Sequence, residues 1–199
     1  MNSLFIDTHD KDIIITLFKN GKVLEASLKS SERHHSDFTM PMIESVLKNN
    51  NLTVHELDEI LVVNGPGSFT GVRIGVTIAK TLAYTLNIPI KTITSLECLA
   101  VSSNIKEKKI SIIRDVKGVF CSLFDENNNL IAEPSYMTNS NFDEYIKNND
   151  IKSKTIIEEI SYDFEKIYSQ FNNIEQQNAH EVKPIYIKEI EVLKNDKNC

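Results

Sequence analysis

The amino-acid sequence predicts an α/β protein in which one order of elements (three strands, a helix, a strand and a helix) occurs twice. Short apolar runs rich in β-branched residues alternate with segments of helical periodicity, and the second half of the 199 residues repeats the order of the first. Four of the six glycines fall within residues 65–75, between a strand-like run and a helix of small residues. Because no sequence repeat of fixed period accompanies this order, one irregular α/β domain is the alternative.

The first elements form a three-stranded meander followed by a helix. Strands are expected at 4–7, 12–19 and 22–28, each a short apolar run. Asn20-Gly21 joins the last two, since both residues readily adopt the positive φ of a two-residue hairpin turn. Residues 36–50 carry apolar side chains at helical spacing, which predicts an amphipathic helix capped by Ser36 or Asp37.

Two capping boxes help to place the next elements. Thr53 with Glu56 predicts a short helical turn, and Thr94 with Glu97 predicts a helix that opens near Leu96. Between them we expect a buried strand at 59–64, a helix at about 70–86 and a strand at 88–93. In the second half, strands are expected at 109–115, 118–124, 129–138 and 154–159, and helices at 141–148 and 161–171. The last polar residues of the tail 182–199 are expected to fray.

Composition excludes several classes of protein. The chain is 41% hydrophobic and 25% charged, with a net charge of −6 and no apolar run of membrane-spanning length. Neither half is basic, so the chain is not expected to bind a nucleic acid alone, because such affinity comes from clustered Lys and Arg. Cys98, Cys121 and Cys199 are few and widely spaced, which indicates reduced thiols. The start "MNSLFIDTHDKD" has no basic region, so we expect a cytoplasmic protein without a signal peptide.

The glycine-rich loop matches neither common nucleotide-binding motif. It lacks the Lys-Ser or Lys-Thr of a phosphate loop, and Thr70 stands where a dinucleotide loop needs its third glycine. An anion near residues 68–71 is one interpretation, because backbone N–H groups at a helix start face outward. The favoured interpretation is a structural loop in which glycines permit unusual φ, proline fixes the turn and Ser68 or Thr70 caps the helix. Its residues are Gly65, Pro66, Gly67, Ser68, Thr70 and Gly71.

The helix after this loop carries a narrow stripe of small residues. Gly75, Ala79 and Ala83 recur every four positions and so lie on one face of the helix. That stripe permits close packing, either on the chain's own sheet or against a helix of a partner protein. Arg73 and Lys80 lie along a neighbouring line and would flank such an interface.

A resemblance to a known family rests on four segments: "FIDT" at 5–8, "HSDFTMPMIESVLK" at 35–48, the run from "DEILVVNGPGSFTGVRIG" to "SLECLA" at 58–100, and "VKPIYIK" at 182–188. They are similar to the TsaB family, also called YeaZ, a non-catalytic partner in the synthesis of threonylcarbamoyladenosine in bacterial tRNA. The resemblance implies an actin-like (ASKHA) fold of duplicated lobes with mixed sheets. Residues 1–100 would form the N-terminal lobe, with the glycine loop and the docking helices, and 101–199 a smaller C-terminal lobe.

The resemblance also implies that the chain holds no metal or nucleotide cofactor. The catalytic paralogue binds metal through His-x-x-x-His, but Ser95 and Leu99 stand at these positions here, and Leu99 cannot ligate. No glycine follows Gly118, which disfavours close approach of a nucleotide to the second lobe. Asp7-Thr8 is followed by His9-Asp10 rather than glycine, which favours a structural turn over a phosphate loop. The histidines, His9, His34, His35, His55 and His180, are interpreted as surface or capping residues.

The leading hypothesis is therefore an interaction protein that docks a TsaD-like catalytic paralogue and, through it, a TsaE-like ATPase. The modified adenosine would lie next to the tRNA anticodon, and tRNA would be contacted only indirectly. The alternatives are a stand-alone actin-fold enzyme, either a phosphotransferase or a metallopeptidase-like hydrolase, and a homodimer acting alone. The partner interface is expected at Met42, Val46, Val72, Arg73, Gly75, Val76, Ala79, Lys80 and Ala83.

Overall fold

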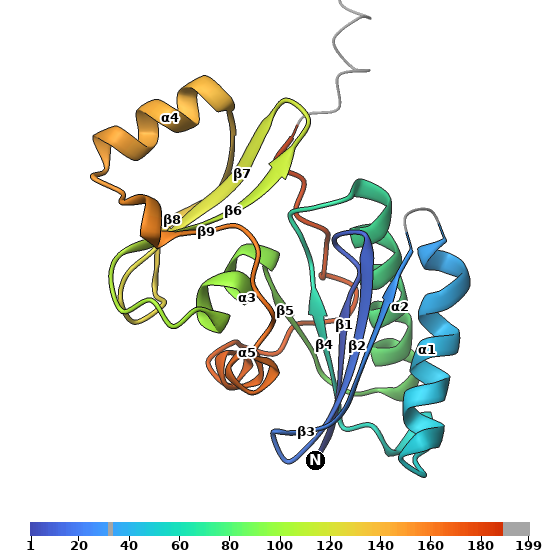
Figure 1. Cartoon of the computed structure of the whole chain (residues 1–199). Helices are drawn as coiled ribbons and strands as arrows, with labels where there is room; N and C mark the ends of the chain where they lie inside the picture. The colour runs from blue at the N-terminus through green and yellow to red at the C-terminus, as the bar shows by residue number, and fades with distance from the viewer. Residues whose placement is uncertain (32–33, 189–199) are drawn as a thin grey trace, which may run out of the picture.

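Two mixed sheets with their helices make up the computed structural model, which describes residues 1–31 and 34–188 (Figure 1). The first sheet has the order β3-β2-β1-β4-β5, and the second has the order β8-β7-β6-β9. The first contains β1 (Asn2–Asp7), β2 (Asp12–Lys19), β3 (Lys22–Ser30), β4 (Glu59–Val63) and β5 (Ile90–Ile93). The second contains β6 (Lys109–Asp115), β7 (Gly118–Phe124), β8 (Leu130–Thr138) and β9 (Ile156–Ile157).

The two sheets repeat one topology. In each, three antiparallel strands form a meander, and the fourth strand runs parallel to the first, so β4 lies beside β1 and β9 beside β6. A helix follows the third strand and another follows the fourth in both halves. The predicted repetition of three strands, helix, strand and helix is confirmed.

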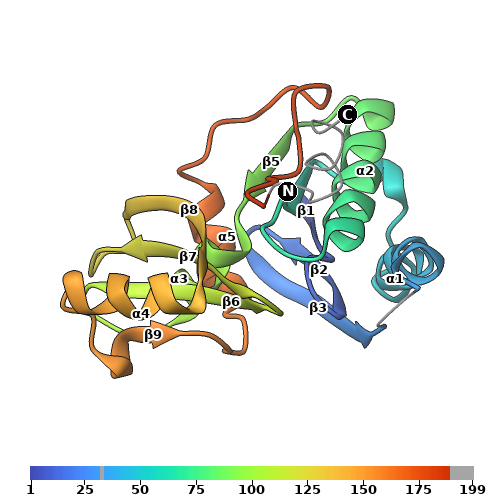
Figure 2. The same cartoon turned by 90° about the horizontal axis from the view of Figure 1, so that it is seen from above.

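The helices cover both sheets on both faces, with one helix packed on each face of the second sheet. Their bounds are α1 (His35–Asn49), α2 (Phe69–Leu86), α3 (Ser95–Ser102), α4 (Asn139–Asn148) and α5 (Phe164–Phe171), with short 3-10 turns at Val54–Glu56 and Ser153–Thr155. Figures 1 and 2 show α1 and α2 side by side on one face of the first sheet, with α3 and α5 on the other. Among the described residues no helix is both long and apolar enough to cross a membrane.

Local sequence signals account for most of the element boundaries. Asn20 and Gly21 have φ of 51° and 78°, as the hairpin turn requires. The predicted capping boxes of Thr53 and Thr94 are both present. The predicted cap of α1 is wrong: the helix begins at His35 with His34 as its N-cap, and Ser36 and Asp37 lie within the first turn, where they hydrogen-bond to each other.

The second half departs further from the predicted bounds. Of the strand predicted at 154–159, only Ile156–Ile157 pairs with β6, and a 3-10 turn occupies the residues before it. The helix predicted at 161–171 begins at Phe164, where the Asp163 side chain accepts a hydrogen bond from the Lys166 amide at 3.1 Å. The predicted fraying concerns 189–199, outside the described residues.

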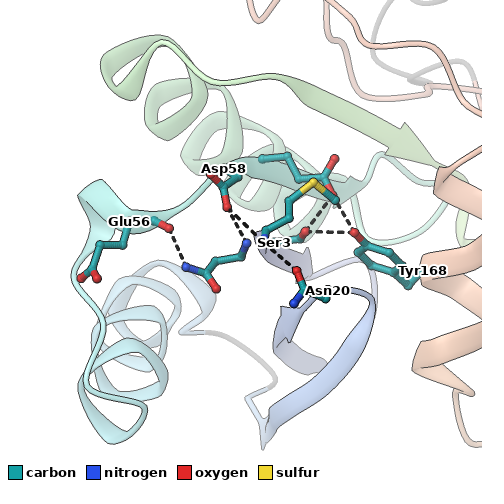
Figure 3. Close-up of polar contacts among 8 residues, drawn as sticks. Ser3, Asn20, Glu56, Asp58 and Tyr168 are labelled. Carbon is teal, nitrogen blue, oxygen red and sulfur yellow. Dashed lines mark hydrogen bonds and ion pairs between the residues drawn. The ribbon is translucent and has the colours of Figure 1, made fainter.

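A buried polar cluster ties α5 to the first sheet. Ser3 and Tyr168 point toward one another, and both hydroxyls donate to Oε1 of Glu59, at 2.7 and 3.2 Å (Figure 3). Lys91 lies 3.6 Å from the other carboxylate oxygen of Glu59 and donates to the Phe171 carbonyl. Helix α5 follows the strands of the second sheet in the sequence but packs against the first sheet. The lobe boundary at residue 100, which falls within α3, stays a prediction.

Candidate functional site

The glycine-rich loop between β4 and α2 lies directly against the turn that follows β1. The Ser68 amide donates to the His9 carbonyl at 2.6 Å, and a Cβ added at Gly67 would lie 2.3 Å from that same oxygen. A Cβ at Gly71 would lie 2.1 Å from the Thr8 carbonyl oxygen. The Ser68 hydroxyl accepts from the Gly71 amide and caps α2. The glycines are therefore explained by close backbone packing inside the chain.

Ser95 holds the other end of the loop. Its amide donates to the Gly65 carbonyl at 3.0 Å, and its hydroxyl donates to the Pro66 carbonyl at 2.6 Å. Gly65 has φ of 102°, a conformation that favours glycine. Leu99, one turn further along α3, is buried. Ser95 and Leu99, which stand where the catalytic paralogue has its metal-binding histidines, thus support the loop and pack in the core. Thr70 lies exposed beside the Ser68 cap.

The small-residue stripe of α2 is buried against the rest of its own chain. Gly75, Ala79 and Ala83 are buried, and a Cβ at Gly75 would lie 2.3 Å from the Thr8 hydroxyl oxygen. Of the nine residues expected at a partner interface, seven are buried within this chain: Met42, Val46, Val72, Gly75, Val76, Ala79 and Ala83. Of the two alternatives for this stripe, packing on the chain's own sheet is therefore the one that the structure shows, and the partner interface stays a prediction.

Arg73 is exposed and Lys80 is half-buried, and the two side chains have different surroundings. The Arg73 guanidinium lies 5.2 Å from the centre of the Phe69 ring on the exposed side of α2. Lys80 instead donates to the carbonyls of His180 and Val182, at 3.3 and 2.8 Å. Lys80 is thus tied to the C-terminal segment of its own chain.

The histidines differ in exposure, and His9 is partly buried whereas His35 is buried. His34, His55 and His180 are exposed, in line with the prediction. His9 and His35 are not surface residues: the His9 Nδ1 lies 2.7 Å from Oδ1 of Asp7, and the His35 Nε2 lies 2.7 Å from the Asp10 carbonyl oxygen. Nothing in their sequence neighbourhood marks this difference, because the contacts arise from the turn after β1.

Charge and burial set the protonation states around Asp7. Burial lowers the pKa of His9, but the carboxylates of Asp7 and Asp10 outweigh this effect and raise it above its usual value. Burial, reinforced by the charge of Asp7, raises the pKa of the Cys98 thiol and the Tyr162 hydroxyl well above their usual values. Both groups are therefore protonated at neutral pH, which makes Cys98 a poor nucleophile.

A cleft of about 600 Å³ lies between the two sheets. The loop around Pro66 and the start of α2 form one wall, β6 and β7 form the opposite wall, and residues 185–188 border it. Two basic side chains of its lining form ion pairs: Lys188 pairs with Asp115 at 2.5 Å, and Arg114 pairs with Glu158 at 2.6 Å. The hydrogen bond from Lys188 lowers the pKa of Asp115.

Sequence reasoning missed the role of the C-terminal segment 178–188. Val182 is buried beside α2, the Ile185 amide donates to the Asn64 carbonyl, and Lys188 bridges to the second sheet. The apolar residues of "VKPIYIK" indicate that this segment packs on the protein, but they do not indicate which helix or strand it contacts. The segment therefore covers one side of α2, so that less of this helix is exposed to solvent.

Comparisons with known proteins agree with this arrangement. Residues 23–117 match the family described as TsaD, tRNA N6-adenosine threonylcarbamoyltransferase. The tRNA threonylcarbamoyladenosine biosynthesis protein TsaB of Bacillus subtilis (strain 168) is 38% identical over 135 residues, which are 67% of this chain and 59% of that protein. The TsaB of Buchnera aphidicola subsp. Schizaphis graminum is 32% identical over 155 residues, 76% of this chain and 71% of that protein.

A solved structure shows the same fold over nearly the whole chain. YeaZ from Pseudomonas aeruginosa superposes with a TM-score of 0.77 at 18% identity, covering 93% of this chain and 100% of that one. At that identity the likeness establishes the fold alone. The fold, the glycine loop and the two aligned relatives together show that this chain belongs to the TsaB family of tRNA threonylcarbamoyladenosine biosynthesis proteins.

Proposed function

We propose that this chain is a non-catalytic subunit that docks a TsaD-like paralogue and so enables threonylcarbamoyl transfer to the adenosine next to the tRNA anticodon. The observation that carries the non-catalytic part is Ser95, which is fully buried and donates its hydroxyl to the Pro66 carbonyl. A side chain so engaged offers no ligand to a metal, and Leu99 offers none by its chemistry. The TsaE-like ATPase and the tRNA are contacted through the paralogue.

We propose that the docking surface consists of the solvent-exposed sides of α1 and α2, because the stripe of Gly75, Ala79 and Ala83 is buried. On α2 the exposed side chains Thr70, Arg73, Thr77 and Thr81 follow helical spacing along one line. On α1, Met40 is 46% exposed beside the exposed Glu44. Short hydroxyl side chains let a second helix approach closely, while Met40 and Arg73 supply apolar area and charge at its margins.

Co-purification with the TsaD-like paralogue from the same source tests the docking. Thr77→Arg is expected to weaken capture at least tenfold, about 1.4 kcal/mol, because a long charged side chain at the centre of a helix contact must be displaced or desolvated. The matched control is Asn148→Arg, which adds the same charge on α4 of the second lobe. Equal capture by both variants and the wild type would remove this surface from the proposal.

Ligand titrations test the non-catalytic part separately. The isolated chain is expected to give no calorimetric signal with ATP and no stoichiometric metal in elemental analysis. Micromolar ATP binding or a bound metal would instead support the stand-alone enzyme.

A gel shift with tRNA should show no saturable complex until the paralogue is added, because the net charge is −6 and neither half is basic.

A further inference from the structure

The last described residues of the chain cross the cleft between the two sheets. Figures 1 and 2 show this segment, in red, between the strands of the first sheet and those of the second. Residues 185–188 line the cleft of about 600 Å³ together with residues from both of its walls. The segment therefore lies where it can link one wall to the other.

One end of this segment is fixed to the first sheet and α2. The Ile185 amide donates to the Asn64 carbonyl at 2.8 Å, next to the glycine-rich loop. The Tyr186 ring lies 5.0 Å from the ring of Phe69 at the start of α2. The buried Val182 belongs to the same core as the buried side of α2. Backbone pairing and core packing thus hold this end.

The other end is fixed to the second sheet by side chains alone. The Lys188 ammonium pairs with the Asp115 carboxylate at 2.5 Å and lies 5.1 Å from the centre of the Tyr136 ring. The Tyr136 hydroxyl donates to the same carboxylate at 3.0 Å. The hydrogen bond between Lys188 and Asp115 lowers the pKa of Asp115 and raises the pKa of Lys188, so both groups are charged at neutral pH.

Helix α3 connects the two halves at a different place. Its Cys98 and Val101 belong to the core between the first sheet and α5. Leu96 and Ala100 pack instead with Phe124 of the second sheet. Because this apolar contact with the second sheet is small, relative motion of the two halves is the ordinary expectation unless another contact restrains it.

We propose that residues 185–188 form a clamp that holds the cleft closed, and that the two halves move apart about α3 when the Lys188–Asp115 ion pair is broken. The first-sheet end of the clamp is held by backbone pairing and by the core around Val182. Its second-sheet end depends on one partly exposed ion pair and a ring contact. The Lys188 end is therefore the end that releases. The clamp acts within one chain and does not depend on docking of the paralogue.

Distance measurements between two spin labels test the clamp in the full chain. In a Cys199→Ser background, Ser45→Cys on α1 and Asn148→Cys on α4 place labels at exposed sites on opposite sides of the molecule (Figure 2). The other two cysteines of the chain are buried. Lys188→Glu and Asp115→Lys should each lengthen and broaden the distance distribution, because each places like charges at the end of the clamp. The double variant restores opposite charges and should return the distribution to that of the labelled parent.

The matched control is Lys183→Glu, which makes the same charge change at an exposed position of the same segment. It should leave the distance distribution unchanged. The proposal would be overturned by single variants at Lys188 and Asp115 that keep the parent distribution, by a double variant no closer to the parent than the single ones, or by an equal change in Lys183→Glu. Circular dichroism confirms that each variant is folded.

Thiol reactivity shows whether the cleft itself opens. Val72 lines the cleft and is 3% exposed, so Val72→Cys in the unlabelled Cys199→Ser background places a thiol that reagents reach only when the two halves separate. Adding Lys188→Glu should make its reaction with an aromatic disulfide about fivefold faster, the upper range for loss of a partly exposed ion pair. Adding Lys183→Glu should leave the rate unchanged. Equal rates in all three proteins would mean that the cleft stays closed without the clamp, which is the opposite of the proposal.

Discussion

Gly75 lies against Thr8 so closely that a Cβ at position 75 would stand 2.3 Å from the Thr8 hydroxyl oxygen. That hydroxyl cannot simply move away, because it donates to the Gly71 carbonyl at 2.7 Å. Helix α2 and the turn after β1 are thus fixed together by a position that tolerates no side chain.

Gly75→Ala is therefore expected to destabilise the protein by about 1–3 kcal/mol, although alanine favours helices, because the added methyl overpacks this contact. Thermal or urea unfolding measures the loss. Thr77→Ala on the exposed side of α2 is the control and should change stability little. A Gly75→Ala variant as stable as the wild type would show that the contact relaxes without cost.

Ala79→Arg should prevent folding or lower the melting temperature sharply. Ala79 is fully buried between α2 and the first sheet, and an unpaired buried charge costs several kcal/mol. Thr77→Arg, two positions earlier and exposed, should keep the wild-type melting temperature. If Ala79→Arg were as stable as Thr77→Arg, the stripe would have to face solvent.

The sequence predicts the fold well because its signals are local. The Asn20-Gly21 turn, the Thr94–Glu97 capping box and the apolar runs each specify one element, and their order specifies the repeat. Boundaries fail where side chains have competing partners, as at Ser36 and Asp37, or where a strand is as short as Ile156–Ile157.

The candidate site is less predictable because its contacts are long-range. Helical spacing placed Gly75, Ala79 and Ala83 on one face, but spacing alone cannot say whether that face meets the chain's own sheet or a partner. The answer depends on Thr8, more than sixty residues earlier in the sequence. Likewise, no residue near Lys80 in the sequence predicts its hydrogen bond to the Val182 carbonyl.

Tyr168→Phe should destabilise the protein by about 1–3 kcal/mol, because it removes a hydrogen bond to the buried Glu59 carboxylate. The aromatic ring itself remains packed against Phe18. Tyr84→Phe is the matched control, since Tyr84 is 65% exposed. Urea unfolding of both variants measures the difference, and equal stability would mean that Ser3 and Lys91 satisfy Glu59 without Tyr168.

The ion pair of His9 with Asp7 predicts a specific pH dependence. The pKa of His9 is raised in the folded protein above its ordinary value of 6.5, so folding favours the protonated imidazole. The resulting stabilisation is fully present below about pH 6.5 and is lost as pH rises through the pKa of His9 in the folded protein.

The variant His9→Asn tests this pH dependence, because asparagine can keep a neutral donor near Asp7 but does not titrate in this range. The difference in unfolding free energy between the wild type and His9→Asn should therefore shrink as pH rises toward 8, whereas His55→Asn, at an exposed position, should show no such trend. A wild-type advantage that is constant with pH, or that grows, would show that the His9 pKa is not raised by folding.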